Sequence, residues 1–381
     1  MNILFVTSNF PPLNGGIANF DYNICKSLHQ KGHKLVVLAN SIKGSEKFDL
    51  AQGFEIIRLK GNLRPTSIEA ISKLLYLVLK NNIDIVFFGH FGSTHWLGGV
   101  LSRIILKVPY VILVHGTEFN AYFSRFTFVD KWASGIVLKN AKGIIANSQV
   151  TRNLVHERGY PLEKIQILNP GVDVEVLKMV DKGVKMKEEL KLNDNKILLT
   201  VARLVAKKNH ENILKALAVV IKEVENVTYV ILGEGEERTR LESLTRELGL
   251  EEYVKFLGQI KHEDIQLYYN ICDIFVMPSK TIDIDYESFG IVYLEANACG
   301  KPVIAGKSGG VDDAVIDGVT GILVNPDDID EISQAILCLL KDEKYAKELG
   351  ENGRQRVEKE MNWNIAGNKI EMILNNVQTR A

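Results

Sequence analysis

Residues 2–39, NILFVTSNFPPLNGGIANFDYNICKSLHQKGHKLVVLA, contain two apolar runs of strand length with a helical pattern between them. The first run, Ile3 to Val6, is wholly apolar, as expected for a strand buried on both faces of a parallel sheet. The loop NFPPLNGG follows, and a helical pattern from about Ile17 ends at the turn KGH. The second run, KLVVLA, predicts another strand, so the stretch predicts a βαβ unit.

The same alternation continues through both halves of the chain. In the first half the runs IDIVFFG, YVILVHG and GIIANS each end in small or polar residues. The second half begins again with ILLTVAR and alternates helical and strand patterns up to residue 306. Because parallel strands present their carboxyl ends at one edge of a sheet, functional residues are expected on those ends.

Chain length and one irregular stretch define the predicted domains. A chain of 381 residues exceeds the roughly 250 to 300 residues at which a single core stops growing. The turn-rich, charged segment 169–196 separates the two halves, so we place the boundary near residue 172. The predicted fold is α/β, with two doubly wound Rossmann-like domains, 1–172 and 173–360, facing across a cleft. A helix in 361–381 is expected to return to the N-terminal domain.

The composition argues against several classes of protein. The formal net charge is −1, which provides no field to gather nucleic acid, so no nucleic-acid partner is expected. The cysteines Cys25, Cys272, Cys299 and Cys338 form no C-x-x-C pair and are predicted to be small core residues in a reducing compartment. The start, MNILFVTSNFPP, has no basic leader and too few apolar residues for a signal or a membrane span. We therefore expect a cytoplasmic protein.

Two glutamates eight positions apart stand out in ESFGIVYLEA, residues 287–296. Ser288 is a favoured N-cap, so a helix entrance that attracts anions is predicted directly after it. The amides at that entrance belong to Phe289, Gly290 and Ile291. Glu295 then lies about two turns inside the helix and leans back toward the entrance, while Glu287 approaches from the loop. For Glu295 alone, an ordinary helix-surface glutamate is an equal alternative.

Other candidate residues follow strand ends. Arg203 ends ILLTVAR and Lys208 comes five residues later, so both cations are expected at the border of one site. The alternative is that both are solvated surface charges. Gly15 and Gly16, between the first strand and its helix, either let a ligand approach the backbone or form a simple turn. His115 follows the strand in YVILVHG, where a structural histidine is the alternative to a functional one.

Together these residues resemble the retaining GT-B glycosyltransferases of family 4, whose hallmark is an E-x7-E motif, here Glu287 and Glu295. The likeness extends over most of the chain through SNFPPLNGGIANF, HGTEF, ANS, NPGVD, VARLVAKKN, LGEGEER, FLGQI and GGVDDAVIDGVTGILVNP. The segment ESFGIVYLEANACGKPVIAG is most similar to the phosphatidylinositol mannosyltransferase-like branch, whose members use lipid acceptors.

The resemblance implies a role for each candidate. Glu295 would bind the ribose hydroxyls and Glu287 the transferred sugar, while Arg203 and Lys208 would neutralise the diphosphate. The donor site would be completed by Gly15 and Gly16 near the diphosphate, the backbone around Ile260 at the nucleobase, and the amides of Phe289, Gly290 and Ile291.

Two positions need separate mention. By the resemblance, His115 lies near the reactive side of the sugar and joins Arg203, Lys208 and Glu287 as a catalytic residue. Asn209 follows Lys208 where the family usually has glycine. The conformation of this turn can therefore differ from that in the family, whereas the positive charge of Lys208 is kept.

The predicted activity is transfer of a hexosyl group, with retention, from a nucleotide-diphosphate sugar to a hydroxyl of a glycan or lipid acceptor. GDP-mannose is the favoured donor, with UDP-glucose and UDP-N-acetylglucosamine left open. A nucleotide-sugar epimerase of the same fold is one alternative. A nicotinamide-dependent dehydrogenase is another, although SNFPPLNGGIANF lacks the G-x-G-x-x-G fingerprint.

No cofactor or metal is expected. Asp283 and Asp285 form a D-x-D, but two lone aspartates make a poor magnesium site, and a solvated loop is favoured. Segment 119–132, FNAYFSRFTFVDKW, is aromatic with interspersed cations. This pattern is typical of a peripheral membrane contact, here on the cytoplasmic face, and equally of packing beneath a lid or in the acceptor cleft.

Overall fold

The computed structural model describes residues 1–13, 15–60, 68–91, 95–125, 135–179, 183–192 and 194–379. The chain divides into two compact units, Met1–Pro170 with Trp363–Ala381 (unit 1) and Gly171–Asn362 (unit 2). The first unit ends at Pro170, and the predicted boundary was near residue 172. The C-terminal segment belongs to unit 1 from Trp363 onward, where we had placed the change at residue 361.

The described residues of unit 1 form a seven-stranded parallel sheet in the order β3-β2-β1-β4-β5-β6-β7. Its strands are β1 Asn2–Thr7, β2 Lys34–Asn40, β3 Glu55–Leu59, β4 Ile85–Phe88, β5 Tyr110–Val114, β6 Gly143–Ala146 and β7 Ile165–Ile167. Its helices are α1 Gly16–Gln30, α2 Glu46–Leu50, α3 Ile68–Lys80, α4 His95–Leu106, α5 Thr117–Arg125, α7 Gln149–Glu157 and α16 Trp363–Thr379. The strand order reverses at β1, so the sheet is doubly wound, as predicted.

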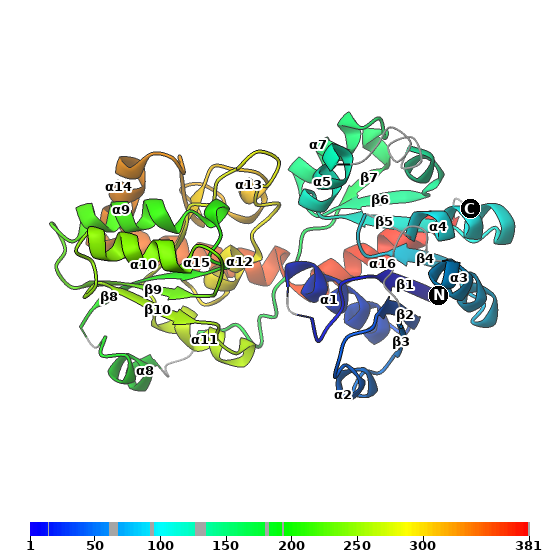
Figure 1. The fold of residues 1–381 in the computed structure, drawn as a ribbon, viewed down its shortest axis with the longest axis horizontal. Coiled ribbons are helices and arrows are strands. Elements are labelled where there is room, and N and C mark those ends of the chain that lie inside the picture. The colour runs from blue at the N-terminus through cyan, green and yellow to red at the C-terminus, as the bar shows by residue number, and fades with distance from the viewer. Residues whose placement is uncertain are drawn as a thin grey trace. The chain divides into compact units, whose positions relative to one another are not determined.

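Alternate residues of strand β1 face opposite helical layers. Ile3 and Phe5 pack in a buried cluster with residues of α1 and α16, whereas Leu4 and Val6 pack with α3 and α4. Burial on both faces explains why the strand is continuously apolar. Figure 1 shows α16, in red, beside α1, in blue. The two helices are so close that a Cβ at Gly367 would lie 1.8 Å from Ser27 Oγ.

Unit 2 repeats this architecture with a six-stranded parallel sheet in the order β10-β9-β8-β11-β12-β13. Its strands are β8 Lys196–Val201, β9 Val227–Leu232, β10 Val254–Gly258, β11 Ile274–Met277, β12 Val303–Gly306 and β13 Gly321–Val324. Its helices are α8 Gly183–Glu189, α9 His210–Val220, α10 Arg238–Glu247, α11 His262–Ile271, α12 Ile291–Ala298, α13 Val311–Ala314, α14 Ile329–Lys341 and α15 Glu343–Glu360. The order again reverses, at β8, and confirms the second Rossmann-like domain.

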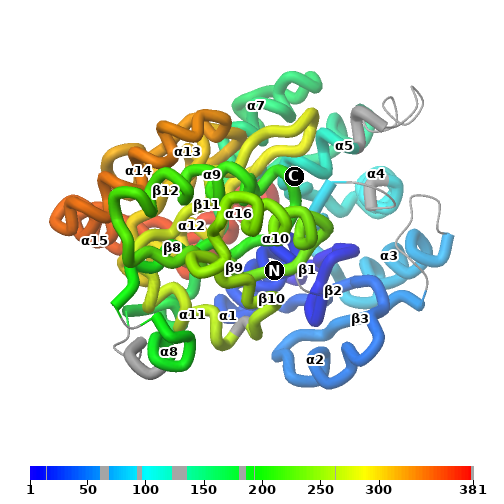
Figure 2. The backbone as a smooth tube through the Cα atoms, turned by 60° about the vertical axis from the view of Figure 1, so that its left-hand side comes forward, coloured from blue at the N-terminus to red at the C-terminus, as the bar shows by residue number. Residues whose placement is uncertain are grey.

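Two helical layers enclose the unit 2 sheet. Helices α9 and α14 pack side by side in one apolar cluster (Figures 1 and 2). Helices α11 and α12 contribute to a second cluster against the opposite side chains of the strands. Cys338 was predicted to be a core residue, and this was wrong: it is exposed on α14, whose buried face is formed by other residues of the amphipathic pattern.

Candidate active site

Loops at the carboxyl edge of the unit 2 sheet hold most of the predicted donor residues. Arg203 and Lys208 follow β8, Ile260 follows β10, and Glu287 lies in the connection from β11 to α12. Since β8 and β11 are neighbouring strands, their loops meet at one edge. This topology brings together Lys208 and Glu287, which are 79 positions apart in the sequence.

Lys208 and Glu287 form an ion pair at this edge. The Lys208 ammonium donates to Glu287 Oε2, and each side chain is only 14% exposed. The same two loops form a second ion pair, between Lys207 Nζ and Asp285 Oδ1 at 2.7 Å. An ammonium carries three N–H donors, so Lys208 retains donors for a further anion while it is bonded to one carboxylate.

The turn after Lys208 is left-handed. Lys208 ends the short 3-10 turn Ala206–Lys208, and Asn209 follows with φ 62° and ψ 34°. Glycine takes this conformation freely and asparagine tolerates it. Asn209 therefore forms a turn of the kind that glycine would form at this position.

The entrance of α12 differs from the prediction. The N-cap is Gly290, with φ 86°, and the helix begins at Ile291, so the prediction of a Ser288 cap was wrong. A Cβ at Gly290 would lie 2.3 Å from the Tyr293 ring, which leaves glycine as the residue that fits. Glu295 consequently lies one turn, not two, inside the helix. Within the described residues, no acceptor bonds the amides of Phe289, Gly290 and Ile291.

Glu295 is fixed by a buried tyrosine. Tyr269 on α11 donates its hydroxyl to Glu295 Oε2 at 2.7 Å. Burial raises the pKa of Tyr269, and the nearby Glu295 carboxylate raises it further, so this hydroxyl is a donor at neutral pH. Our sequence prediction missed Tyr269, because its position on an apolar helix face gave no sign that its hydroxyl would reach Glu295.

Arg203 and Ile260 occupy the same edge with different exposure. Arg203 is exposed, and among the described residues its guanidinium forms no ion pair. Ile260 is partly buried against the cluster that includes α11 and α12. The edge therefore offers a cation and an apolar surface in addition to the Lys208–Glu287 pair.

The D-x-D aspartates do not converge. Asp283 is exposed and has φ 53°, in a turn closed by paired backbone hydrogen bonds between Ile282 and Asp285. Asp285 instead pairs with Lys207. A search of the described residues finds no group of three or more His, Cys, Asp or Glu side chains that could hold a metal ion.

His115 lies at the carboxyl edge of the unit 1 sheet, after β5. Its Nε2 donates to the Gly89 carbonyl oxygen at 3.0 Å, and its backbone N–H donates to Glu118 Oε1 at 2.6 Å. Burial lowers the pKa of His115 to about 3, so the imidazole is neutral at physiological pH. Burial raises the pKa of Glu118 to about 7.

Several polar residues around His115 were missed by the sequence prediction. Asp21 is fully buried and accepts from Thr7 Oγ1 at 2.6 Å, and burial raises its pKa. Asp21 Oδ1 lies 4.0 Å from His115 Nε2, which is no ion pair because the histidine is neutral. His90 bonds Ser8 Oγ at 2.9 Å, and burial lowers its pKa to about 4.

One signal could have identified Asp21. It precedes the buried residues Ile24, Cys25 and Leu28 of α1 by three, four and seven positions, which is the spacing of a single helix face. A carboxyl on a buried face requires a polar environment, so the helical period alone predicts a polar cluster there.

Gly15 and Gly16 lie at the start of α1. Gly15 is the N-cap and Gly16 the first helical residue. A Cβ built at either position would meet no atom within 4 Å. Packing therefore requires glycine at neither position, but the φ of 158° at Gly15 is one that residues with a side chain rarely adopt.

The aromatic segment 119–132 is only partly described. Residues 126–134 lie outside the described residues, as do the side chains of 122–125, so the structure does not bear on the membrane interpretation. Over the ranges that are described, none of the helices combines the length and apolarity needed to cross a bilayer.

Two family models match the chain. Residues 14–176 match Glycosyltransferase Family 4, and residues 181–356 match Glycosyl transferases group 1. A GDP-mannose-dependent alpha-(1-6)-phosphatidylinositol monomannoside mannosyltransferase of Mycolicibacterium smegmatis is 30% identical, with 98% of each chain covered. N-acetyl-alpha-D-glucosaminyl L-malate synthase of Bacillus anthracis is 26% identical over 77% of this chain and 74% of its own.

The fold is also similar to that of solved structures. HepE of Anabaena in complex with UDP superposes with a TM-score of 0.84 at 22% identity, covering 99% of this chain and 100% of that one. The likeness over the whole length establishes that both doubly wound units belong to one known fold.

Proposed function

Because the chain belongs to the group 1, family 4 glycosyltransferases of the GT-B fold, we propose that it transfers mannose from GDP-mannose, with retention, to a hydroxyl of a lipid-linked acceptor. That it is a glycosyltransferase using a nucleotide sugar follows from the family. The choice of GDP-mannose is supported by the Mycolicibacterium relative, whose name specifies that donor. UDP-glucose and UDP-N-acetylglucosamine are the donors to test against it.

The observation that carries the proposal is the meeting of Lys208, Glu287 and the α12 entrance at one sheet edge. A diphosphate needs both a cation and N–H donors, and this edge offers both. On donor binding, the Lys208 ammonium would share its donors between Glu287 and the diphosphate. Arg203, which is exposed and unpaired by any described carboxylate, would supply a second cation.

The remaining donor contacts follow from what the edge presents. Glu295 would accept hydrogen bonds from two ribose hydroxyls, with Tyr269 holding its carboxylate in place. Glu287 would contact the transferred sugar, and the backbone around Ile260 would receive the nucleobase. In unit 1, Gly15 and Gly16 would serve the diphosphate, which at Gly16 is supported by the open space where a side chain would be.

We expect chemistry without a protein nucleophile. The acceptor hydroxyl attacks the anomeric carbon on the face that the diphosphate leaves, the bond to the diphosphate breaks, and a diphosphate oxygen takes the hydroxyl proton. Arg203, Lys208 and the α12 amides would stabilise the negative charge that grows on the leaving group. Neutral His115 would then orient a sugar hydroxyl rather than carry a charge.

A lipid-linked acceptor would require contact with a membrane surface. Helices α3 and α4 of unit 1 present Leu79, Ile104 and Ile105, which are 64%, 64% and 63% exposed, beside the exposed Lys80 and Lys107. Apolar side chains flanked by lysines suit an anionic lipid surface. Flotation with anionic and neutral vesicles tests this, since binding to anionic vesicles alone is expected.

The function is tested by supplying the purified protein with each nucleotide sugar and a phosphatidylinositol mannoside, and determining the product by NMR. We expect an α-mannoside from GDP-mannose, which retains the donor configuration. A β-linked product would contradict retention. Conversion of the donor without a new glycosidic bond would instead support the epimerase.

A further inference from the structure

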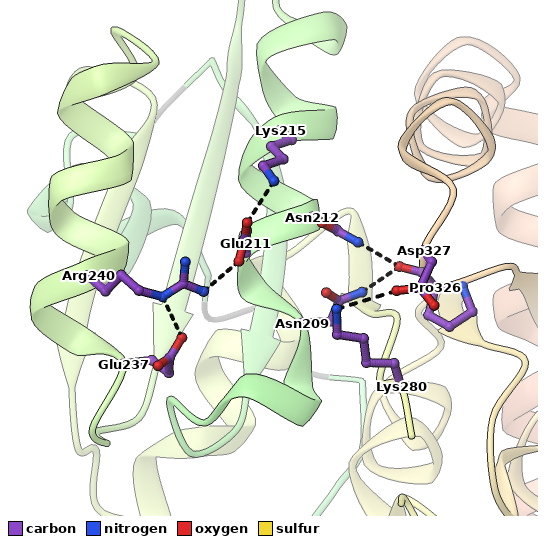
Figure 3. Close-up of polar contacts among 9 residues, drawn as sticks. All are labelled: Asn209, Glu211, Asn212, Lys215, Glu237, Arg240, Lys280, Pro326 and Asp327. Atoms are coloured by element: carbon purple, nitrogen blue, oxygen red, sulfur yellow. Dashed lines mark hydrogen bonds and ion pairs between the residues drawn. The ribbon is translucent and has the colours of Figure 1, made fainter. Parts of the chain in front are cut away.

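Asn209 connects three loops at the carboxyl edge of the unit 2 sheet. Its Nδ2 donates to the Pro278 carbonyl oxygen at 3.0 Å and to the Pro326 carbonyl oxygen at 2.6 Å. Pro278 follows β11, Pro326 follows β13, and Asn209 itself belongs to the loop after β8. Figure 3 shows the Asn209 side chain directed at the loop of Pro326 and Asp327.

The orientation of this amide is determined by its partners. Both partners are carbonyl oxygens, which only accept, so the NH₂ group and not the oxygen must face them. The residue is 2% exposed, and Oδ1 has no hydrogen-bond partner among the described residues. Because the side chain is buried and both of its N–H donors are bonded to carbonyl oxygens, the amide is held in one orientation.

The side chain does not serve the helix that it precedes. Asn209 is the N-cap of α9, a position where asparagine usually accepts from the first turn, yet it makes no such bond. Its amide is used to join the loops instead. The left-handed backbone at Asn209 turns the chain so that this is feasible.

The residue that this arrangement fixes is Lys208. The Lys208 and Asn209 amides donate to Val205 and Ala206 carbonyl oxygens, so both residues belong to one tight turn. The Lys280 amide, two residues after Pro278, donates to the Lys207 carbonyl oxygen at 2.9 Å. Movement of Asn209 would therefore move the adjacent lysine.

We propose that Asn209 is a positioning residue, which holds Lys208 where its ammonium can bind the diphosphate of the donor. The inference rests on the proposed function, because it assigns Lys208 to that diphosphate. It adds a residue that would not touch the donor but would act through the neighbouring cation.

The chain contains a matched control for this role. Asn212, on α9, is 8% exposed and also donates to the Pro326 carbonyl oxygen, at 2.8 Å (Figure 3). Asn212→Ala removes an anchor of the same loop without changing the turn that carries Lys208. Both positions should affect folding stability, but only Asn209 should affect the diphosphate.

The test is a double-mutant cycle read out by nucleotide affinity. Titration calorimetry with GDP and with UDP would be performed on wild type, Asn209→Gly, Lys208→Ala and the double variant, with Asn212→Ala as control. Glycine keeps the left-handed turn, so Asn209→Gly is expected to fold. Asn209→Asp, which replaces the two N–H donors by oxygen, provides a second variant of nearly the same shape.

In the wild-type background we expect Asn209→Gly and Asn209→Asp to weaken binding of the nucleotide about 10-fold, and Asn212→Ala to change it less than about 2-fold. In the Lys208→Ala background, Asn209→Gly should leave the nucleotide affinity almost unchanged, while it lowers the melting temperature as much as it does in the wild-type background. An equal loss of affinity in both backgrounds, or an equal loss for Asn212→Ala, would overturn the inference. If neither GDP nor UDP binds the wild type, the proposed function itself fails, and the inference fails with it.

Discussion

The carboxyl edges of the two sheets differ in chemistry although the sheets share one architecture. The unit 2 edge carries two lysine–carboxylate pairs and the amides at the α12 entrance. The unit 1 edge carries buried ionisable groups whose pKa values are shifted toward the neutral form by burial. These groups are Asp21, His90, His115 and Glu118.

This difference suggests a division of labour. Cations and free amides suit an anion such as a diphosphate. Neutral buried donors and acceptors suit hydroxyl groups, because a charged group there would have to be desolvated without a counter-ion. The same fold can thus provide one edge that suits charged groups and another that suits uncharged hydroxyl groups.

The largest effect should come from removing a cation at the unit 2 edge. Lys208→Ala should lower kcat/KM by roughly 10²-fold or more, because it removes a charge matched to the leaving diphosphate. Lys215→Ala is the control: Lys215 also pairs with a carboxylate, Glu211 at 2.6 Å, but on the surface of α9 (Figure 3). Steady-state kinetics should show little change for Lys215→Ala, and similar values for both variants would refute the role of Lys208.

The two glutamates should have separable effects. Glu295→Ala should weaken donor binding by about 1 to 3 kcal/mol, since it would delete the acceptors that we propose for two ribose hydroxyls. Glu287→Ala should lower kcat more than it weakens binding, because Glu287 pairs with Lys208 and, in the proposed complex, would contact the transferred sugar. Titration of the donor and single-turnover rates distinguish these effects. Small, equal effects on both quantities would argue against the assigned roles.

A pH-dependent effect should come from the unit 1 edge. Burial lowers the pKa of His115 from 6.5 to about 3. As the pH falls, the unfolded state therefore takes up a proton at this histidine before the folded state does. The contribution of His115 to the free energy of unfolding is thus greatest above pH 6.5, where the histidine is neutral in both states. This contribution is lost as the pH falls from 6.5 toward 3. Between pH 7.5 and pH 5, wild type should lose about 2 kcal/mol more stability than His115→Gln. Guanidinium unfolding at both values measures this, and identical losses would mean that His115 is not held neutral.

The smallest effect should come from metal removal. Excess EDTA should leave transfer unchanged, because Arg203, Lys208 and the α12 amides can neutralise a diphosphate. The Asp283→Asn, Asp285→Asn double variant should remain active, with a modest loss from the broken Lys207–Asp285 pair. Complete loss of activity with EDTA, restored by Mn²⁺ or Mg²⁺, would reveal a metal site at this loop.

Most of the fold could be predicted from the sequence because strand and helix periods are local. The run Ile3 to Val6 and its successors predict buried parallel strands, and the structure has them. The start of α12 could not be predicted from Ser288, because the cap is determined by tertiary packing. Gly290 is required by the nearby Tyr293 ring, whose hydroxyl bonds the Met277 carbonyl oxygen at 2.7 Å.

The candidate site was predictable where a motif marks it and not where packing creates it. Glu287 and Glu295 were selected by their spacing, and Lys208 by its place after a strand. Neither pattern shows that Lys208 pairs with Glu287 or that Tyr269 on α11 bonds Glu295. Asp21 was overlooked although the helical period places it on the buried face of α1, and that period does not show which residues Asp21 contacts. Such partners depend on long-range contacts, which residue spacing does not encode.

Thermal unfolding of the wild type with GDP, UDP and NAD tests most directly whether the unit 2 edge binds the diphosphate of a nucleotide sugar. A ligand at a hundredfold excess over its Kd should stabilise the fold by about 2.7 kcal/mol. We predict this stabilisation with GDP, less with UDP, and none with NAD. Stabilisation by NAD alone would contradict the account and favour a dehydrogenase.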